Sequence, residues 1–221
     1  MKLLHVDSSP KGEHSNSRAL SRYFVDRLGE RVPDLEIDYL DVAAEPLSPP
    51  SGLFTRAIYT PPPERTDEMN VELAASDRLC ERALDANALV MAMPMHNFSM
   101  PAAFKAFVDN LVRVGVTYTF NEDGRPVGRF GRHRVLFITS RGADLRAGGP
   151  MAHMDALTPA LRAAFGFIGV SAPEFVDAQP LQFADRAAHE AALARAKAEL
   201  DGVAREWGGG LPAQGSEKQK A

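Results

Sequence analysis

Apolar and polar residues alternate in blocks along the chain, and the period of the pattern changes from block to block. Short apolar runs at 3–6, 88–93 and 134–139 are typical of strands that are covered on both faces. Two further strands are predicted at 35–42 and 174–177. Because blocks of helical period separate these strands, the pattern indicates an α/β domain with a parallel sheet.

Apolar residues recur every three or four positions between the predicted strands. This spacing predicts five helices: one after Ser17 that runs through Leu28, one that spans Met69 to Leu84, one from Pro101 to about Gly115, one from about Pro150 to Phe167, and one from Asp185 to Trp207. The proline-rich stretch 46–63 is expected to be irregular, since consecutive prolines remove backbone donors. Residues 118–124 predict a short extended piece and a tight turn.

Strands that alternate with helices require right-handed crossovers. The spacing fits a flavodoxin-like three-layer sandwich, in which a five-stranded parallel sheet of order 2-1-3-4-5 carries helices on both faces. Residues 1–207 are expected to form this single domain, and residues 208–221 a disordered tail.

Composition narrows the function classes. The 221 residues contain one cysteine, Cys80, and carry a formal charge of −4 with no extended basic face. The chain is therefore expected to be cytoplasmic, without disulfides, and not to bind nucleic acid. No apolar run is long enough for a membrane span, and the start of the chain does not resemble a signal peptide. The six histidines show no metal-ligand spacing, so the expected ligand is a small molecule.

Three polar loops follow strands that should be neighbours in this sheet. In open α/β sheets, ligands bind outside the carboxyl ends of the strands, where the strand order reverses. That rule selects the loops 8–17, 94–100 and 140–150, which are rich in hydroxyls, amides and glycine. Each loop alone is weak support for a ligand site, and their common edge is the stronger observation.

The first loop offers the hydroxyls of Ser9, Ser15 and Ser17 and the amides at a helix start, which together can hold a phosphate. A serine cap without a ligand is the commoner role of such residues. Neither a G-x-G-x-x-G motif nor a P-loop is present, which favours a mononucleotide.

The other two loops can meet a planar heterocycle. The amide of Asn97 can donate and accept at the polar edge of a flavin, although an isolated loop asparagine more often bonds its own backbone. Gly142 would allow the main chain to approach a ring, and Arg141 has a solvated surface charge as its simpler interpretation.

With these residues in view, the chain resembles the FMN-dependent NADH azoreductases, also described as NADH quinone reductases, over Met1 to Trp207. Five segments carry the resemblance: Ser15-Asn16-Ser17, Pro94-Met95-His96-Asn97-Phe98, residues 109–117, Ile138-Thr139-Ser140-Arg141-Gly142, and residues 165–169. Relatives commonly have Tyr at the position of His96 and a second Gly at the position of Ala143. These departures bear on the flavin environment and on the choice of acceptor.

The resemblance implies a homodimer with two active sites at the subunit interface. It also implies noncovalent FMN, held by Ser9, Ser15, Asn16, Ser17, Pro94, Met95, His96, Asn97, Phe98, Ser140, Arg141 and Gly142. NADH or NADPH would donate hydride to the flavin, which would pass it on to quinones or azo compounds by ping-pong kinetics. No protein nucleophile or metal is required.

An aromatic acceptor needs a flat apolar wall, for which Phe98, Tyr118, Phe120 and Phe165 are candidates, with a contribution from residues 46–63 of either subunit. Any one of these aromatics is more often core than pocket.

Two rival classes share the topology. A flavodoxin-type electron carrier would also bind FMN, but such carriers tend to be strongly acidic. A low-molecular-weight phosphatase would need a Cys-x5-Arg loop after the first strand, and a receiver domain would need an aspartate where the chain has Pro94. Both are disfavoured.

Overall fold

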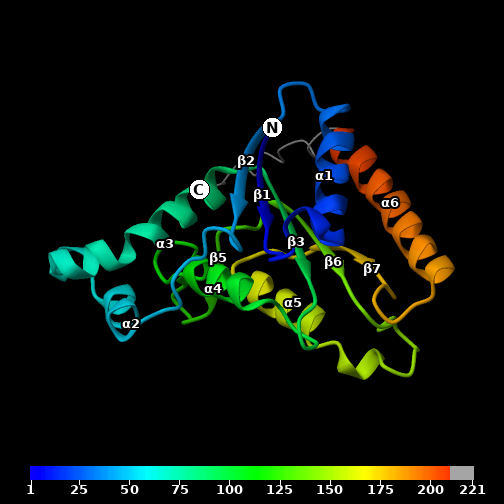
Figure 1. The fold of residues 1–221 in the computed structure, drawn as a ribbon. Helices are drawn as coiled ribbons and strands as arrows, with labels where there is room; N and C mark the ends of the chain where they lie inside the picture. Colours follow the sequence, from blue (N-terminus) through cyan, green and yellow to red (C-terminus); the bar gives the residue numbers. More distant parts are fainter. Residues whose placement is uncertain (210–221) are drawn as a thin grey trace.

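A parallel sheet of five strands forms the centre of the computed structural model, which describes residues 1–209. In spatial order, the strands are β2 (Glu36–Asp41), β1 (Lys2–Asp7), β3 (Ala88–Pro94), β6 (Arg134–Ser140) and β7 (Glu174–Ala178). Every neighbouring pair is parallel (Figure 1). The predicted α/β fold with a five-stranded parallel sheet is confirmed.

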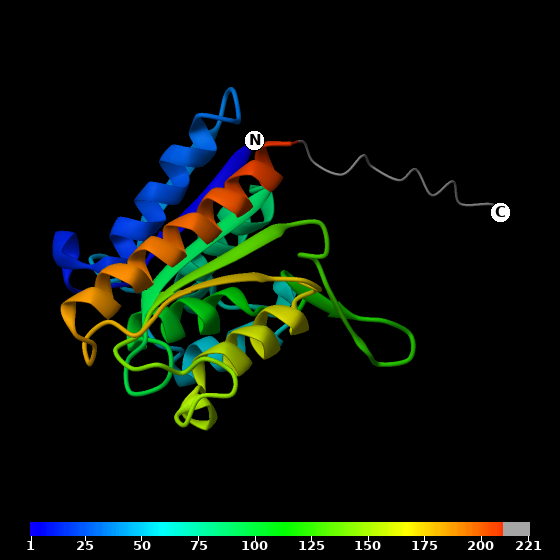
Figure 2. The ribbon, with the colours of Figure 1, turned by 90° about the vertical axis from the view of Figure 1, so that its right-hand side faces the viewer.

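Two short strands lie between β3 and β6 in the chain and do not join the sheet. They are β4 (Tyr118–Phe120) and β5 (Pro126–Gly128), which pair with each other as an antiparallel hairpin. The expected order 2-1-3-4-5 took no account of them, so the order in chain numbering is β2-β1-β3-β6-β7. Figure 2 shows this hairpin projecting from the domain.

Helices cover both faces of the sheet because the strand side chains alternate between the faces. Leu3 and Val90 belong to one apolar cluster with α1 (Asn16–Gly29) and α6 (Arg186–Gly208). Leu4 and Met91 belong to another cluster with the helices of the opposite face, α3 (Asp67–Asp85), α4 (Ala102–Leu111) and α5 (Leu157–Phe167). The result is a three-layer arrangement (Figures 1 and 2).

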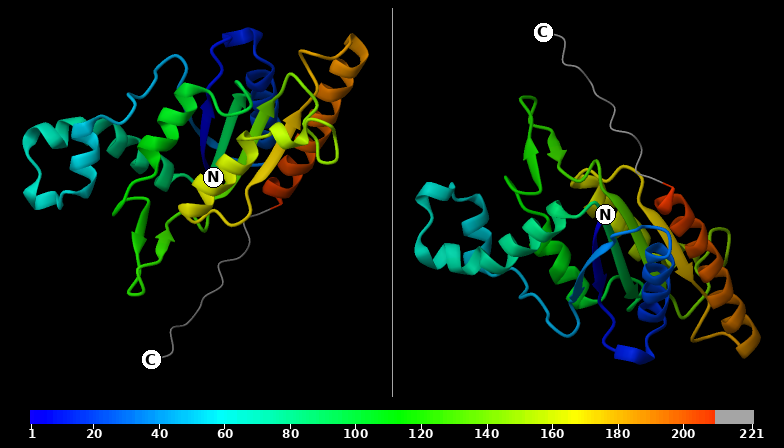
Figure 3. Two further views of the ribbon diagram at one scale, coloured as in Figure 1. Left: turned by 90° about the horizontal axis from the view of Figure 1, so that it is seen from below. Right: turned by 90° about the horizontal axis from the view of Figure 1, so that it is seen from above.

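The prediction that residues 46–63 are irregular was wrong in part. They contain the helix α2 (Gly52–Tyr59) and the start of a 3-10 turn (Pro62–Glu64). The prolines stand before and after residues 52–59, and the side chain of Ser51 caps the helix by accepting a bond from the Phe54 amide at 3.0 Å. Figure 3 shows α2 and the start of α3 projecting beyond the sheet.

Two helix boundaries also differ from the predictions. The helix α4 ends at Leu111 rather than near Gly115, and the hydroxyl of Thr117 then accepts a bond from the Arg113 amide at 2.8 Å. The helix expected from Pro150 begins as a 3-10 turn (Ala152–Met154), and α5 starts only at Leu157. The carboxylate of Asp155 separates the two by accepting bonds from the next amides.

The helix α6 continues to Gly208, so the expected tail lies outside the described residues except for 208 and 209. No helix among residues 1–209 has the length and apolar character needed to cross a membrane.

Candidate functional site

The parallel register brings the three polar loops to one edge of the sheet. Asp7 pairs with Ala92 at the end of β1, and Pro94 pairs with Ser140 at the ends of β3 and β6. Backbone bonds continue past the strands, from the Ser8 amide to the Ala92 carbonyl at 3.0 Å and from the Met95 amide to the Ser140 carbonyl at 2.9 Å. The loops therefore start side by side, as the sheet rule predicts.

The first loop presents neutral hydrogen-bonding groups at the start of α1. Ser15 is the N-cap residue, and its hydroxyl lies 3.0 Å from that of Ser17. The amides of Asn16 and Ser17 have no carbonyl four residues back within the helix, so they remain available to a ligand. Ser9 is also buried here, 1% exposed. This combination of hydroxyls and helix amides suits a phosphate monoester.

The second loop is a tight turn that presents its side chains outward. His96 and Ser99 exchange two backbone bonds of 3.0 Å, and the two residues between them, Asn97 and Phe98, both have positive φ, 47° and 68°. Consecutive positive φ values are the pattern of a type I′ turn. The side chains of His96, Asn97 and Phe98 are all exposed, so the Asn97 amide can reach the edge of a heterocycle.

This turn stores backbone strain. Asn tolerates the left-handed region, but a bulky residue such as Phe98 does not, at a cost of about 1–3 kcal/mol. The surroundings hold the turn in place, because the Phe98 carbonyl accepts a bond from the Ala156 amide at 3.1 Å. Strain of this kind concentrates at functional sites.

The third loop is held from below by Arg141. Its guanidinium is 1% exposed and donates to Thr139 at 2.9 Å, to Asp155 at 2.8 Å and to Thr158 at 2.7 Å. A further bond of 3.1 Å reaches Asp177 on β7. The side chain of Arg141 is therefore turned away from solvent, and it fixes the loop instead of offering donors to a ligand.

Gly142 lies against the segment that follows β7. A Cβ on this residue would lie 3.2 Å from the ring of Phe183, and its carbonyl accepts bonds from the amides of Leu181 and Phe183. Phe183 is 78% exposed. The sequence reasoning missed this aromatic residue, because nothing in the local pattern connects it with Gly142, 41 positions earlier.

The four aromatic candidates are not brought together within one chain. Phe98 is 39% exposed at the loop edge, whereas Phe165 is 1% exposed and packs edge-on against Phe137 in the core. Tyr118 and Phe120 lie on the hairpin, where the ring of Tyr118 contacts that of Phe167. Figure 2 shows the hairpin at the end of the molecule opposite the loop after β1. Of these four residues of the chain, Phe98 alone lies at the three loops.

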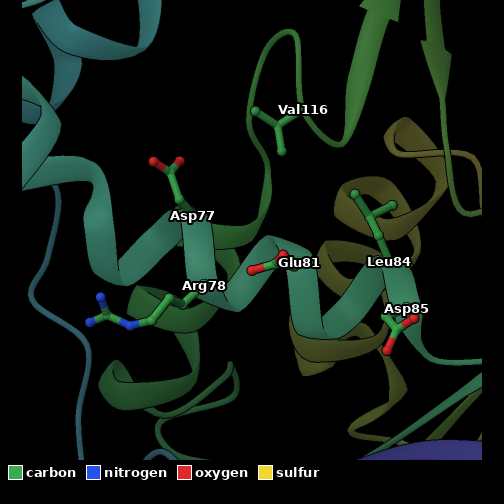
Figure 4. Close-up of a pocket in the computed structure, with 6 residues that line it drawn as sticks. All are labelled: Asp77, Arg78, Glu81, Leu84, Asp85 and Val116. Atoms are coloured by element: carbon green, nitrogen blue, oxygen red, sulfur yellow. The ribbon is translucent and has the colours of Figure 1, made fainter.

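A separate hollow lies between α3 and the loop that carries Val116. It is lined by Asp77, Arg78, Glu81, Leu84, Asp85 and Val116, and the acidic residues follow one another at four-residue spacing (Figure 4). The carboxylates would repel a phosphate, and no group of residues suited to hold a metal ion occurs within residues 1–209. The hollow therefore does not fit a flavin mononucleotide.

The sheet edge does fit this cofactor. The first loop supplies neutral donors for a phosphate, and the turn of Asn97 supplies an exposed amide. The space beside Gly142 is taken up by Gln182 and Phe183, so this glycine fixes the loop against the segment after β7. These features match a ligand with a phosphate at one end and a planar ring with mixed donors and acceptors at the other.

Comparison with known proteins also points to FMN. A family model described as a flavodoxin-like fold matches residues 1–203. An FMN-dependent NADH:quinone oxidoreductase of Trichormus variabilis is 37% identical over 207 residues, which is 94% of this chain and 97% of the relative. Another protein of the same description, from Bradyrhizobium diazoefficiens, is 40% identical over 182 residues, 82% of this chain and 89% of the relative.

The fold is shared with a solved FMN-dependent NADH-azoreductase of Bacillus anthracis in complex with FMN. The match covers 93% of this chain and 98% of that one, with a TM-score of 0.82 at 22% identity. At this identity the likeness concerns the fold alone.

Proposed function

The chain belongs to the family with the flavodoxin-like fold, and we propose that it is an FMN-dependent oxidoreductase that takes electrons from NADH and reduces quinones and aromatic azo compounds. The convergence of the three loops at one sheet edge carries the proposal, because it supplies a phosphate site and a ring site at the spacing of neighbouring strands. Relatives with 34–40% identity over most of their length are FMN-dependent NADH:quinone oxidoreductases.

The protein residues bind and orient, and bound FMN supplies the two-electron chemistry. Ser9, Ser15, Asn16 and Ser17 would hold the phosphate. Residues 94–98 and 140–142 would surround the ring, with Arg141 fixing its loop from below. The exposed Asn97 amide would stabilise negative charge on the reduced ring. Donor and acceptor would use the same open face in turn, which gives ping-pong kinetics.

We place the second wall of the acceptor site on another copy of the chain. Of the four candidate aromatics, one subunit offers Phe98 at the loops, where the exposed ring of Phe183 lies beside Gly142. Phe120 is 56% exposed and lies on the hairpin, at the opposite end of the molecule from the loop after β1 (Figure 2). A homodimer that sets the hairpin of one copy against the loops of the other would cover both. The single cysteine, Cys80, is free and buried, which fits the reducing cytoplasm that we propose as the location.

Anaerobic titration of the FMN-loaded protein tests the activity. NADH should bleach the flavin absorbance near ~450 nm by two electrons, and a quinone or an azo dye should restore it. NADPH serves as the comparison donor. Flavin that binds but is not reduced by either nicotinamide would instead favour an electron carrier, and failure to bind FMN would contradict the whole assignment.

Mixed dimers test the shared site. Copies with Asn97→Ala and copies with Phe120→Ala should each have low quinone reductase activity, whereas their mixture should recover part of it by forming sites with both residues intact. The control is a mixture of the same two variants, each crosslinked chemically before mixing so that the subunits cannot exchange. Absence of recovery in a mixture that native mass spectrometry shows to contain the mixed dimer would contradict the shared wall.

A further inference from the structure

Arg18 holds the backbone of the first loop from behind. It occupies the third position of α1, and its guanidinium is 11% exposed. Its Nε and Nη2 both donate to the Ser9 carbonyl, at 3.0 and 2.7 Å. Ser9 carries one of the hydroxyls assigned to the phosphate, so these two hydrogen bonds fix the main chain at the phosphate site.

The other donors of Arg18 are anchored on β2. Nη2 and Nη1 reach the two carboxylate oxygens of Asp41 at 2.7 and 2.6 Å, and Nη1 also donates to the Tyr39 hydroxyl at 3.0 Å. All five N–H groups of the guanidinium thus have acceptors. Asp41 is itself fixed, because it accepts bonds from the Ala43 and Ala44 amides.

A second carboxylate extends this group of residues into the core. Tyr39 donates to Asp7 at 3.0 Å, and the hydroxyl of Ser21 on α1 donates to the same carboxylate at 2.8 Å. Asp7 is 4% exposed and lies 3.8 Å from Arg18. The group therefore ties the end of β1, the edge strand β2 and the first turns of α1 to one another beneath the loop.

The charge of this group cannot attract a phosphate. Arg18 contributes one positive charge, and Asp7 and Asp41 contribute two negative charges. Tyr39 is uncharged, because burial, and then the nearby Asp7, raise its pKa to about 12. With His5, whose Nε2 lies 3.5 Å from Asp7, the formal charges sum to minus one when the imidazole is neutral and to zero when it is charged. The group has no net positive charge in either case, so Arg18 does not act as a free cation toward an anion at the loop.

We propose that Arg18 is a positioning residue for the FMN phosphate, acting by the geometry of its fork and not by its charge. By binding the Ser9 carbonyl it keeps that acceptor turned toward the guanidinium, and the amides and hydroxyls of the loop remain directed to the phosphate. Binding through neutral donors is strengthened by a loop that is fixed before the ligand arrives. The inference rests on the proposed binding of FMN at this edge.

The proposal can be tested without enzyme activity, by measuring how tightly the apoprotein binds FMN and riboflavin. Quenching of flavin fluorescence reports the binding. Riboflavin lacks the phosphate but retains the ring. Arg18→Met should weaken FMN binding roughly tenfold to a hundredfold, while riboflavin binding changes less than about twofold. Arg18→Lys keeps the positive charge but loses the planar, five-donor guanidinium. Its loss of FMN binding free energy should therefore be at least half of the loss in Arg18→Met.

Arg27→Met is the matched control, since Arg27 lies on the same helix but is paired with Glu30 at the surface. It should leave both affinities unchanged. Asp41→Asn loosens the guanidinium without removing it and should give a smaller loss in the same direction, which keeps the test available if the Arg18 variants do not fold.

The outcomes separate the two proposals. Wild-type protein that binds neither flavin would overturn the proposed function. Wild-type protein that binds FMN, with Arg18 variants that lose both flavins equally or with Arg18→Lys equal to wild type, would overturn the role of Arg18 alone.

Discussion

A Cβ atom on Gly128 would lie 1.8 Å from the carbonyl carbon of Ile168. Here β5 crosses the end of α5 with backbone against backbone, and the next residue of that corner, Gly169, has a φ of +106°. The Phe130 amide donates to the Ile168 carbonyl at 2.9 Å and closes the contact. The crossing fixes the hairpin on the domain, and it leaves no room for a side chain.

Gly128→Ala should therefore displace the hairpin. We expect a loss of about 2–3 kcal/mol in the free energy of unfolding, because neither backbone can yield without breaking the bond of Phe130. Urea unfolding measures the loss. Gly131→Ala is the control, since its Cβ would lie 3.6 Å from its nearest neighbour, an ordinary contact. Equal stability of the two variants would show that the crossing is softer than its geometry indicates.

The thiol of Cys80 should be inert in the folded protein. Burial raises its pKa to about 11, and the sulfur lies 3.5 Å from the Asn110 carbonyl. At pH 8 a thiol of this pKa has roughly a hundredfold less thiolate than one with a pKa near 9. Ellman's reagent should react slowly with native protein and rapidly in urea. Fast reaction of native protein would place Cys80 at a more open position.

Local patterns were sufficient for most of the fold. The buried runs that became β1, β3 and β6 carry their signal in consecutive residues, so their existence and parallel pairing could be predicted. The helix α2 was missed because prolines on both sides hid eight residues that contain none. Its start depends on one hydroxyl, that of Ser51, which is a weak signal in a sequence.

The meeting of the three loops at one edge of the sheet was predictable, but the partners of their side chains were not. The sheet rule selects residues 8–17, 94–100 and 140–150 from strand order alone. It does not show that Arg18 binds Asp41, or that Arg141 turns inward to Asp177, because these partners lie 23 and 36 positions away. Nor could it place Tyr118 away from the loops, since that depends on where α4 ends.

The pH dependence of stability should show how much the ionised carboxylate of Asp155 contributes. Burial opposes its ionisation, but bonds from Thr158 and Arg141 outweigh burial and hold its pKa below the usual value. The carboxylate therefore stabilises the fold above the unfolded pKa of about 3.9, and this contribution is lost as the pH falls through the lower folded pKa. Asp155→Asn should cost about 2 kcal/mol at pH 7, and the difference from wild type should shrink below about pH 4.

Asp144→Asn provides the comparison for Asp155. The pKa of Asp144 is lowered to about 2 by its bond with Arg146, but both side chains are more than one third exposed, at 38% and 55%. Solvent screens such pairs, so this variant should change stability by less than about 0.5 kcal/mol at any pH. A pH-independent loss in Asp155→Asn would mean that hydrogen bonding alone, without charge, holds the start of α5.

Phe98 should lower the stability of the fold through its backbone conformation, while its ring influences the choice of acceptor. Its left-handed backbone, with φ of 68°, is costly for Phe and tolerable for Asn. Phe98→Asn should raise the free energy of unfolding of the apoprotein by about 1 kcal/mol, since the strain disappears while little buried surface is lost. The same variant should change the relative rates with quinones and azo dyes more than the affinity for FMN, because the exposed ring is proposed to face the acceptor.

Asp34→Gly is the control. It relieves another positive φ, of 59°, in the turn before β2 and away from the loops, and it should leave the acceptor profile unchanged. If Phe98→Asn stabilised the protein and kept the wild-type acceptor profile, the strain at this turn would have no part in substrate choice.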